Sequence, residues 1–158
     1  MQRPTQGFSL VELMVALAVL AVLASLSVPA YQDYIRRTRV AETLAIARVM
    51  QDQIADNVAN GLPFTNAVRP QSTKYAYLWP NPGNGHVDIT FFKKYFNGTD
   101  YHLDMWLRQT NDQGVVSTIS PGTIPQGRIT WECKGESNPS AQSGYMRLPA
   151  KWAPPHCR

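Results

Sequence analysis

The stretch that decides the fold is GFSLVELMVALAVLAVLASLSVPA, residues 7–30. From Phe8 to Ala30 its only ionisable side chain is that of Glu12, and three serines are the only other polar side chains. A helix rising about 1.5 Å per residue would cross a hydrocarbon core of about 30 Å over this length. A carboxylate in such a helix costs about 2.5–3.5 kcal/mol at mid-bilayer and less near the interface. Glu12 therefore indicates a function beyond anchoring.

Two simpler interpretations of this stretch are a secretory signal peptide and an ordinary single-span anchor. A signal peptide has an apolar centre of about 7–15 residues, followed by a cleavage site of small residues. Here the apolar run is longer and continues into an amphipathic segment, and Gly7, the small residue suited to cleavage, precedes it. A single-span anchor explains the length of the run but not Glu12.

Segment 31–60 has the periodicity of an amphipathic helix. Its apolar residues recur at spacings of three, four or seven, which place them on one helix face, and charged residues occupy much of the rest. The sequence NGLP, residues 60–63, predicts the end of the helix. We therefore expect one helix from Phe8 to about Asn60, about 80 Å long. Pro29 should kink it, because proline lacks an N–H and its ring clashes with the preceding turn.

From Leu62 onward the pattern is that of a β-sheet with many turns. Prolines and glycines make most of 62–85 a predicted loop, in which 74–79 is either a short strand or a docking aromatic segment. Alternation and β-branched or aromatic content predict four strands, at 87–92, 101–107, 115–119 and 129–133. The predicted fold class is α+β, with an antiparallel sheet packed on the second half of the long helix.

The tract GFSLVELM, residues 7–14, resembles the processing site of bacterial type IV prepilins, and the similarity continues through VPAYQDYI, residues 28–35. Ser9 stands where many relatives have threonine. The resemblance implies that a membrane peptidase cleaves between Gly7 and Phe8 and methylates the new amine of Phe8. Glu12, then the fifth residue, would pair with the Phe8 amine of an adjacent subunit in a filament. The family also suggests a four-stranded meander.

The same resemblance implies a division of the chain and a set of partners. Residues 1–7 would be a cleaved leader and 8–30 a transmembrane and filament-core helix. Residues 31–158 would form the globular domain, with an amphipathic helix at 31–60, a sheet region at 86–133 and a C-terminal disulfide loop at 133–157. The implied partners are further copies of the chain, the membrane, the prepilin peptidase and the pilus assembly machinery. The chain would span the inner membrane once and then enter an extracellular pilus.

Cys133 and Cys157 are the only cysteines. An exported domain lies in an oxidising compartment, where such a pair indicates a disulfide. Closing a loop of this size stabilises the fold by about 3.5 kcal/mol in the chain-entropy estimate. The C-terminal region also resembles the disulfide-bounded region of type IVa pilins.

Cations and aromatic residues alternate within and beside this loop, which makes it a candidate binding site for DNA or a host receptor. Packing or solvation of these side chains is the alternative explanation. The candidate residues are Lys134, Tyr145, Arg147, Lys151, Trp152 and Arg158.

Composition and motifs argue against other classes of protein. The net charge is +4, or +3 without Arg3 of the leader, which is too small to indicate nucleic-acid binding by itself. The sequence contains no phosphate-binding glycine loop, no metal-binding helix and no nucleophile elbow, so we expect neither an enzyme nor a cofactor. The cysteine spacing and the scattered histidines, His86, His102 and His156, predict no metal site, and Asp88 and Asp104 are interpreted as solvent-facing.

These observations predict a structural subunit of a type IV pilus that serves adhesion, twitching motility or DNA uptake. A minor pilin and a type II secretion pseudopilin share the N-terminal third and remain alternatives. Paired cysteines near the C-terminus favour a true pilin.

Overall fold

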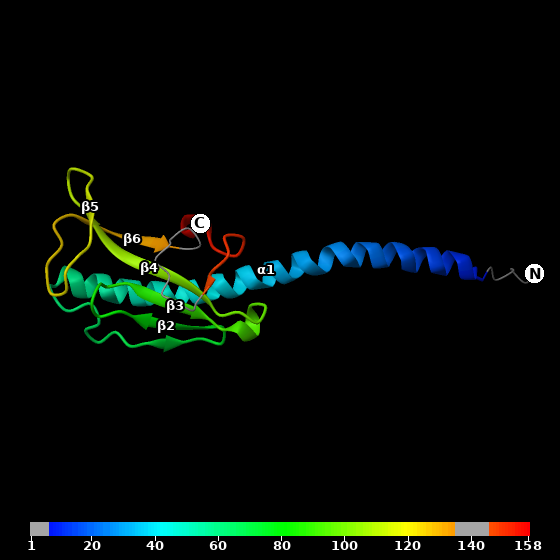
Figure 1. Cartoon of the computed structure of the whole chain (residues 1–158), viewed down its shortest axis with the longest axis horizontal. Helices are drawn as coiled ribbons and strands as arrows, with labels where there is room; N and C mark the ends of the chain where they lie inside the picture. Colours follow the sequence, from blue (N-terminus) through cyan, green and yellow to red (C-terminus); the bar gives the residue numbers. More distant parts are fainter. Residues whose placement is uncertain (1–6, 135–145) are drawn as a thin grey trace, which may run out of the picture. The chain divides into compact units, whose positions relative to one another are not determined.

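The computed structural model describes residues 7–134 and 146–158. The chain divides into two compact units, residues 1–35 and 36–158. Helix α1, Leu10–Ala59, contributes residues to both units and contains 50 residues (Figure 1). The long helix expected from Phe8 to about Asn60 is therefore confirmed to within two residues at its start.

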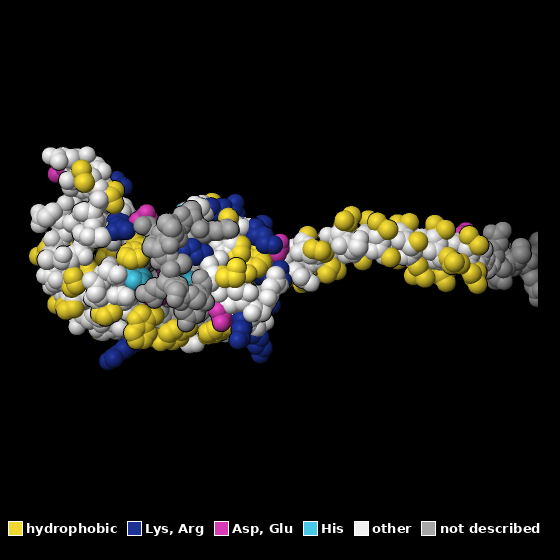
Figure 2. Space-filling model, viewed as in Figure 1, with side chains coloured by type: hydrophobic (Ala, Val, Ile, Leu, Met, Phe, Trp, Pro, Cys, Tyr) yellow, Lys and Arg dark blue, Asp and Glu magenta, His cyan; other side chains and the backbone are white. Residues whose placement is uncertain are grey.

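In the first unit, α1 exposes apolar side chains all along its length. The large hydrophobic residues from Leu10 to Val28 are more than half exposed, and Figure 2 shows hydrophobic side chains along this part of the helix. Pro29 lies inside the helix, and the residues on both sides of it remain helical. Just before it, the hydroxyls of Ser25 and Ser27 donate to the carbonyls of Val22 and Leu23, each at 2.6 Å. The kink at Pro29 stays a prediction.

In the second unit, α1 lies along one face of a β-sheet (Figure 1). The buried helix residues are spaced three or four apart, as the amphipathic pattern predicts. They meet buried residues from alternate positions of the strands, and together these form one hydrophobic core. The main helix residues in this core are Val40, Leu44, Ala47, Met50, Ile54 and Val58, and the main strand residues are Leu78, Ile89, Phe91, Leu103 and Leu107.

The helix ends in a Schellman motif. Gly61 has φ +67°, the left-handed conformation that glycine adopts without a Cβ penalty. The N–H of Leu62 donates to the carbonyl of Asn57 at 2.8 Å, and that of Gly61 donates to the carbonyl of Val58 at 3.0 Å. The helix stop predicted at 60–63 is thus confirmed, and it turns the chain back toward the sheet.

The sheet is built around its longest strand, β4. The order is β1-β2-β3-β4-β5, and both β6 and β7 also pair with β4. All pairings are antiparallel except that of β7, which runs parallel to β4 through Tyr101↔Met146, so the sheet is mixed. The strands are β1 (Gln71–Ser72), β2 (Ala76–Pro80), β3 (Val87–Phe91), β4 (Tyr101–Thr110), β5 (Val116–Ser117), β6 (Arg128–Lys134) and β7 (Met146–Arg147), with 3-10 turns η1 at Lys93–Tyr95 and η2 at Pro155–Cys157.

Three of the four expected strands are confirmed as β3, β4 and β6. The fourth is wrong in extent, because segment 115–119 forms only the two-residue β5. A further five-residue strand, β2, overlaps segment 74–79, for which the sequence allowed either a short strand or a docking segment. Its side chains alternate between buried and exposed, and its proline, Pro80, lies at the last position, where it interrupts no central pairing.

Candidate functional site

The N-terminus of α1 is closed by reciprocal hydrogen bonds between Ser9 and Glu12. The Ser9 backbone N–H and hydroxyl both donate to Oε2 of Glu12 at 3.1 Å, and the Glu12 N–H donates to the Ser9 hydroxyl oxygen at 3.2 Å. Since α1 begins at Leu10, Ser9 is the N-cap and Glu12 the third helical residue, which is the arrangement of a capping box. Our sequence interpretation missed this function, although the Ser-x-x-Glu spacing before an apolar run predicts it.

Gly7 and Phe8 precede the helix and are exposed, with the Phe8 side chain 89% accessible. A Cβ added at Gly7 would meet no atom within 4 Å, so packing does not explain a glycine at this position. The two residues predicted to flank a cleavage site therefore lie together just before the helix, where an enzyme could reach them.

The apolar run and the first turn after it, residues 8–34, expose far more hydrophobic surface than soluble monomers usually do. The structure contains one helix, α1, that is long and apolar enough to cross a membrane, among the residues it describes. An exposed surface of this kind is typical of a segment that lipid or other protein chains cover. The exposed large hydrophobic residues of segment 8–34 are Phe8, Leu10, Val11, Leu13, Met14, Val15, Leu17, Val19, Leu20, Val22, Leu23, Leu26, Val28, Tyr31 and Tyr34.

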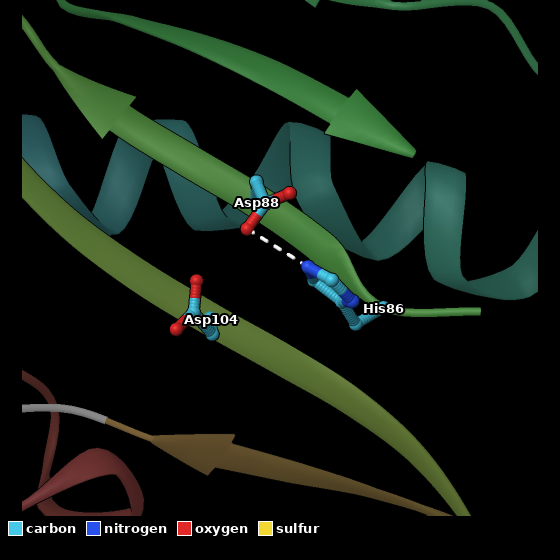
Figure 3. A group of neighbouring side chains, drawn as sticks. All are labelled: His86, Asp88 and Asp104. Atoms are coloured by element: carbon cyan, nitrogen blue, oxygen red, sulfur yellow. Dashed lines mark ion pairs between the residues drawn. The ribbon is translucent and has the colours of Figure 1, made fainter. Parts of the chain in front are cut away.

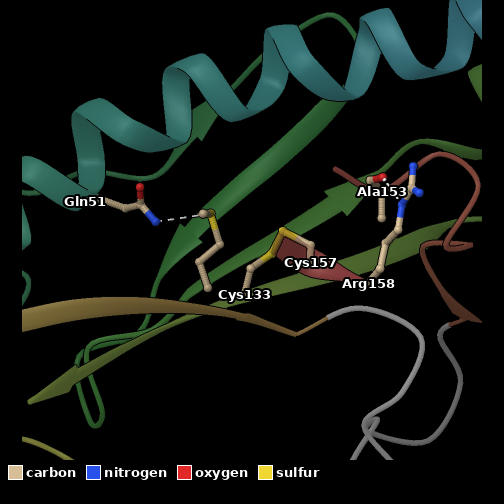
Figure 4. The surroundings of a disulfide bond; sticks show 6 residues. Gln51, Cys133, Ala153, Cys157 and Arg158 are labelled. Atoms are coloured by element: carbon tan, nitrogen blue, oxygen red, sulfur yellow. Dashed lines mark hydrogen bonds between the residues drawn. A yellow bond between two sulfur atoms is a disulfide. The ribbon is translucent and has the colours of Figure 1, made fainter. Parts of the chain in front are cut away.

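The predicted disulfide between Cys133 and Cys157 is present in the structure. It joins β6 to η2, with the two Cα atoms 4.8 Å apart, and Cys157 is almost fully buried (Figure 4). Met105 of β4 lies opposite Cys133 in the sheet, and its sulfur accepts a hydrogen bond from the Gln51 side chain of α1 at 3.3 Å. The disulfide thus ties the C-terminal segment to the layer where helix and sheet meet.

Comparison with known proteins relates this N-terminal segment to a family. Residues 2–28 match the prokaryotic N-terminal methylation motif. The chain is 45% identical over 56 residues to the type IV major fimbrial protein FimA of Dichelobacter nodosus, a match that covers 35% of each protein. A fimbrial protein of Pseudomonas aeruginosa is 26% identical over 145 residues, or 86% of this chain and 89% of that protein. The chain is therefore similar to type IV fimbrial proteins, most clearly over its N-terminal third.

Similarity within this family is concentrated at the N-terminus. The fimbrial protein of Moraxella nonliquefaciens matches over 61 residues at 41% identity, which covers 39% of this chain and 40% of the relative. The chain thus aligns with 35% of the length of the Dichelobacter nodosus protein and 40% of that of the Moraxella nonliquefaciens protein. The long apolar helix followed by a sheet agrees with the α+β type IV pilin fold.

The candidate binding residues of the C-terminal loop lie in different environments. Trp152 is only 3% exposed and packs edge-on against Tyr101, with ring centres 5.4 Å apart, so its ring is not at the surface to stack on a base. Arg147 is directed at Asp104, with Nη1 to Oδ2 at 3.6 Å. Lys151 is exposed, while Tyr145 and the side chain of Lys134 lie outside the described residues. Binding of DNA or a receptor here stays a prediction.

On the sheet face opposite α1, Asp88 of β3 and Asp104 of β4 lie beside His86, which comes just before β3 (Figure 3). Asp88 and Asp104 are directly paired in the register of the two strands, and His86 Nε2 lies 2.9 Å from Asp88 Oδ1. Alternation placed the two aspartates on the correct face, but the expectation of solvent exposure is wrong, because neighbouring side chains leave both of them only partly exposed.

This environment changes the acidity of both carboxyl groups. Burial, together with the hydrogen bond and negative charge of Asp88, raises the pKa of Asp104 to about 6, against an opposing effect of Arg147. Burial also disfavours the charged form of Asp88, but the hydrogen bond and charge of His86 outweigh it and lower the pKa of Asp88. Sequence periodicity could not reveal this cluster, since it depends on which residues face each other across two strands.

Proposed function

We propose that this chain is a structural subunit of a type IV pilus, held in the inner membrane by residues 8–30 and then polymerised into an extracellular filament. The observation that carries the proposal is the match of residues 2–28 to the N-terminal methylation motif, on a helix whose apolar side chains are exposed. Relatives named type IV major fimbrial proteins support the same function. In the filament, the apolar segments of many subunits would cover one another in place of lipid.

Processing is proposed to occur between Gly7 and Phe8, followed by methylation of the Phe8 amine. The exposed position of both residues before α1 supports access by a membrane peptidase. Replacing Gly7 with valine should leave only the full-length precursor in the membrane, because a branched side chain would block the residue before the cut. Mature protein beginning at Phe8 in this variant, detected by mass spectrometry, would refute the assignment.

Glu12 is proposed to guide assembly by pairing with the Phe8 amine of a neighbouring subunit. Among the described residues its carboxylate accepts hydrogen bonds from Ser9 alone, both of them at Oε2. The positive end of the helix dipole, at the same place, further favours a negative charge. Without the carboxylate, the neighbour's ammonium would be buried in an apolar core with no counter-charge, which is strongly unfavourable.

The test of this proposal is Glu12→Leu as the sole copy of the subunit. A plain anchor would insert at least as well with leucine, whereas a filament subunit should be cleaved and stable in the membrane yet absent from sheared surface filaments. Glu12→Gln should be equally or less defective. Glu42→Leu, which removes an exposed carboxylate from the second half of α1, serves as the matched control. A normal filament yield from Glu12→Leu would exclude the pairing mechanism.

A minor pilin or a secretion pseudopilin is the second candidate, since both share the N-terminal segment. Relatives named major fimbrial proteins and the disulfide near the C-terminus favour the major subunit. Quantitative mass spectrometry of purified filaments separates these functions. A major pilin should be the predominant protein, and a trace amount would indicate a minor one.

A further inference from the structure

The imidazole of His86 is held in one orientation by groups outside the acidic pair. Its Nδ1–H donates to the side-chain oxygen of Asn84, an oxygen that also accepts the backbone N–H of His86 at 3.4 Å. The indole of Trp106 stacks on the ring, with centres 4.3 Å apart. With Nδ1 as the donor, the neutral ring presents the lone pair of Nε2 to the carboxylate of Asp88. Two acceptors 2.9 Å apart require a proton on Nε2, or a small widening of the gap to admit a metal ion.

The two neighbouring carboxylates also favour a proton or a cation between them. Asp88 and Asp104 stand directly opposite each other on adjacent strands, a position where like charges are destabilising. Both carboxyl groups and His86 Nε2 converge in the same space between β3 and β4 (Figure 3). Arg147 approaches this group at Oδ2 of Asp104, with Nη1 3.6 Å away.

We propose that His86, Asp88 and Asp104 form a binding site for a zinc ion on the outer face of the sheet. One nitrogen and two carboxylate oxygens, all within 4.8 Å of one another, form the ligand set. Zinc with bonds of about 2.0–2.1 Å in a tetrahedral arrangement requires ligand separations of about 3.4 Å, so a small movement of the Asp104 side chain closes the site. Water would occupy the fourth position.

The surroundings favour zinc over calcium or magnesium. An imidazole ligand suits zinc, whereas the two harder ions prefer sets made entirely of oxygen. The bond from Nδ1–H to Asn84 is of the kind that orients metal-binding histidines, which usually donate their second nitrogen to an oxygen acceptor. A divalent ion neutralises the two carboxylates when the imidazole is neutral. It would also link β3 to β4 at the point where their like charges oppose each other.

The test is zinc titration of the full-length protein in detergent micelles, with no histidine tag and after removal of bound metal with a chelator. We expect one zinc ion per chain by isothermal calorimetry and a rise of several degrees in the unfolding temperature, because zinc binds only the folded arrangement. Magnesium at the same concentration should cause no rise. Cobalt should give the visible absorption of a tetrahedral site.

Two variants and a matched control decide the outcome. His86→Ala and Asp104→Asn should each weaken zinc binding at least tenfold. His156→Ala removes a histidine near the C-terminus, outside the cluster, and should leave binding unchanged. Circular dichroism verifies that each variant is folded. The absence of zinc binding to the unmodified protein would show that a proton alone neutralises the site and overturn the proposal, as would binding that survives both cluster variants.

Discussion

The two halves of α1 share one secondary structure but differ in what covers them. From Leu10 to Ala30 the helix is apolar on every side apart from Glu12 and two serines, and none of the residues from Leu10 to Ile35 is buried. From Arg36 to Ala59 only one stripe is apolar, and the sheet covers it. Both halves form a helix, so what distinguishes them is the spacing of their apolar residues. A one-sided pattern specifies a partner within the chain, whereas a uniform one requires a partner outside it.

It follows that stability and assembly should depend on separate parts of one helix. Substitutions in the second half should unfold the globular unit. Substitutions in the first half should leave that unit intact and change its association with lipid or other subunits. All four tryptophans, Trp79, Trp106, Trp131 and Trp152, lie in the second unit, so tryptophan fluorescence reports on that unit alone.

The largest contrast is expected between Ile54→Ala and Leu20→Ala. Ile54 is fully buried, and its truncation leaves a cavity against the sheet, so the free energy of unfolding should fall by about 2–5 kcal/mol. Leu20 is 60% exposed and has no part in that core, so Leu20→Ala should leave this free energy unchanged. The measurement is urea unfolding of both variants in micelles, followed by tryptophan fluorescence. Equal destabilisation by the two substitutions would contradict the division of the helix.

A somewhat smaller effect is expected from removal of the disulfide. Replacing Cys133 and Cys157 with serine should lower the free energy of unfolding of the second unit by up to about 3.5 kcal/mol, because the unfolded chain regains the entropy of an open loop. The helicity and membrane insertion of the first half should not change. The same unfolding assay tests the variant, with the reduced unmodified protein as control. An unchanged midpoint in both would show that packing alone holds the C-terminal segment.

The comparison also shows which features a sequence can reveal. Local signals predicted the extent of α1 and its stop at 60–63, and cysteine number together with the exported context predicted the disulfide. The sequence did not settle strand β2, because nearby prolines obscure its short alternation, and its pairing with β1 and β3 depends on distant segments. The cluster of His86, Asp88 and Asp104 depends on strand register, which no single segment encodes. The spacing of Ser9 and Glu12 predicts the capping box. The sequence interpretation, however, assigned Glu12 only a partner on another subunit.

The smallest effect, and the one that most sharpens the comparison, concerns Ser9. Its capping bonds mean that Glu12 has a structural function within its own helix as well as the proposed pairing between subunits. Ser9→Ala removes the cap hydroxyl but keeps the Glu12 carboxylate, and should cost about 1 kcal/mol of helix stability. Ser9→Thr keeps a hydroxyl and is the matched control.

If Glu12 acts mainly through the neighbour's amine, Ser9→Ala should still assemble, with a modest loss of filament yield, while Glu12→Leu does not. A loss of about 1 kcal/mol is small beside the cost of burying an unpaired ammonium, which is several kcal/mol. The measurement is the ratio of sheared surface subunit to membrane-bound subunit for the three variants in parallel. If Ser9→Ala abolishes filaments as completely as Glu12→Leu while Ser9→Thr does not, the carboxylate is needed to begin the helix. The first half of α1 would then depend on a contact within its own chain, as the second half does.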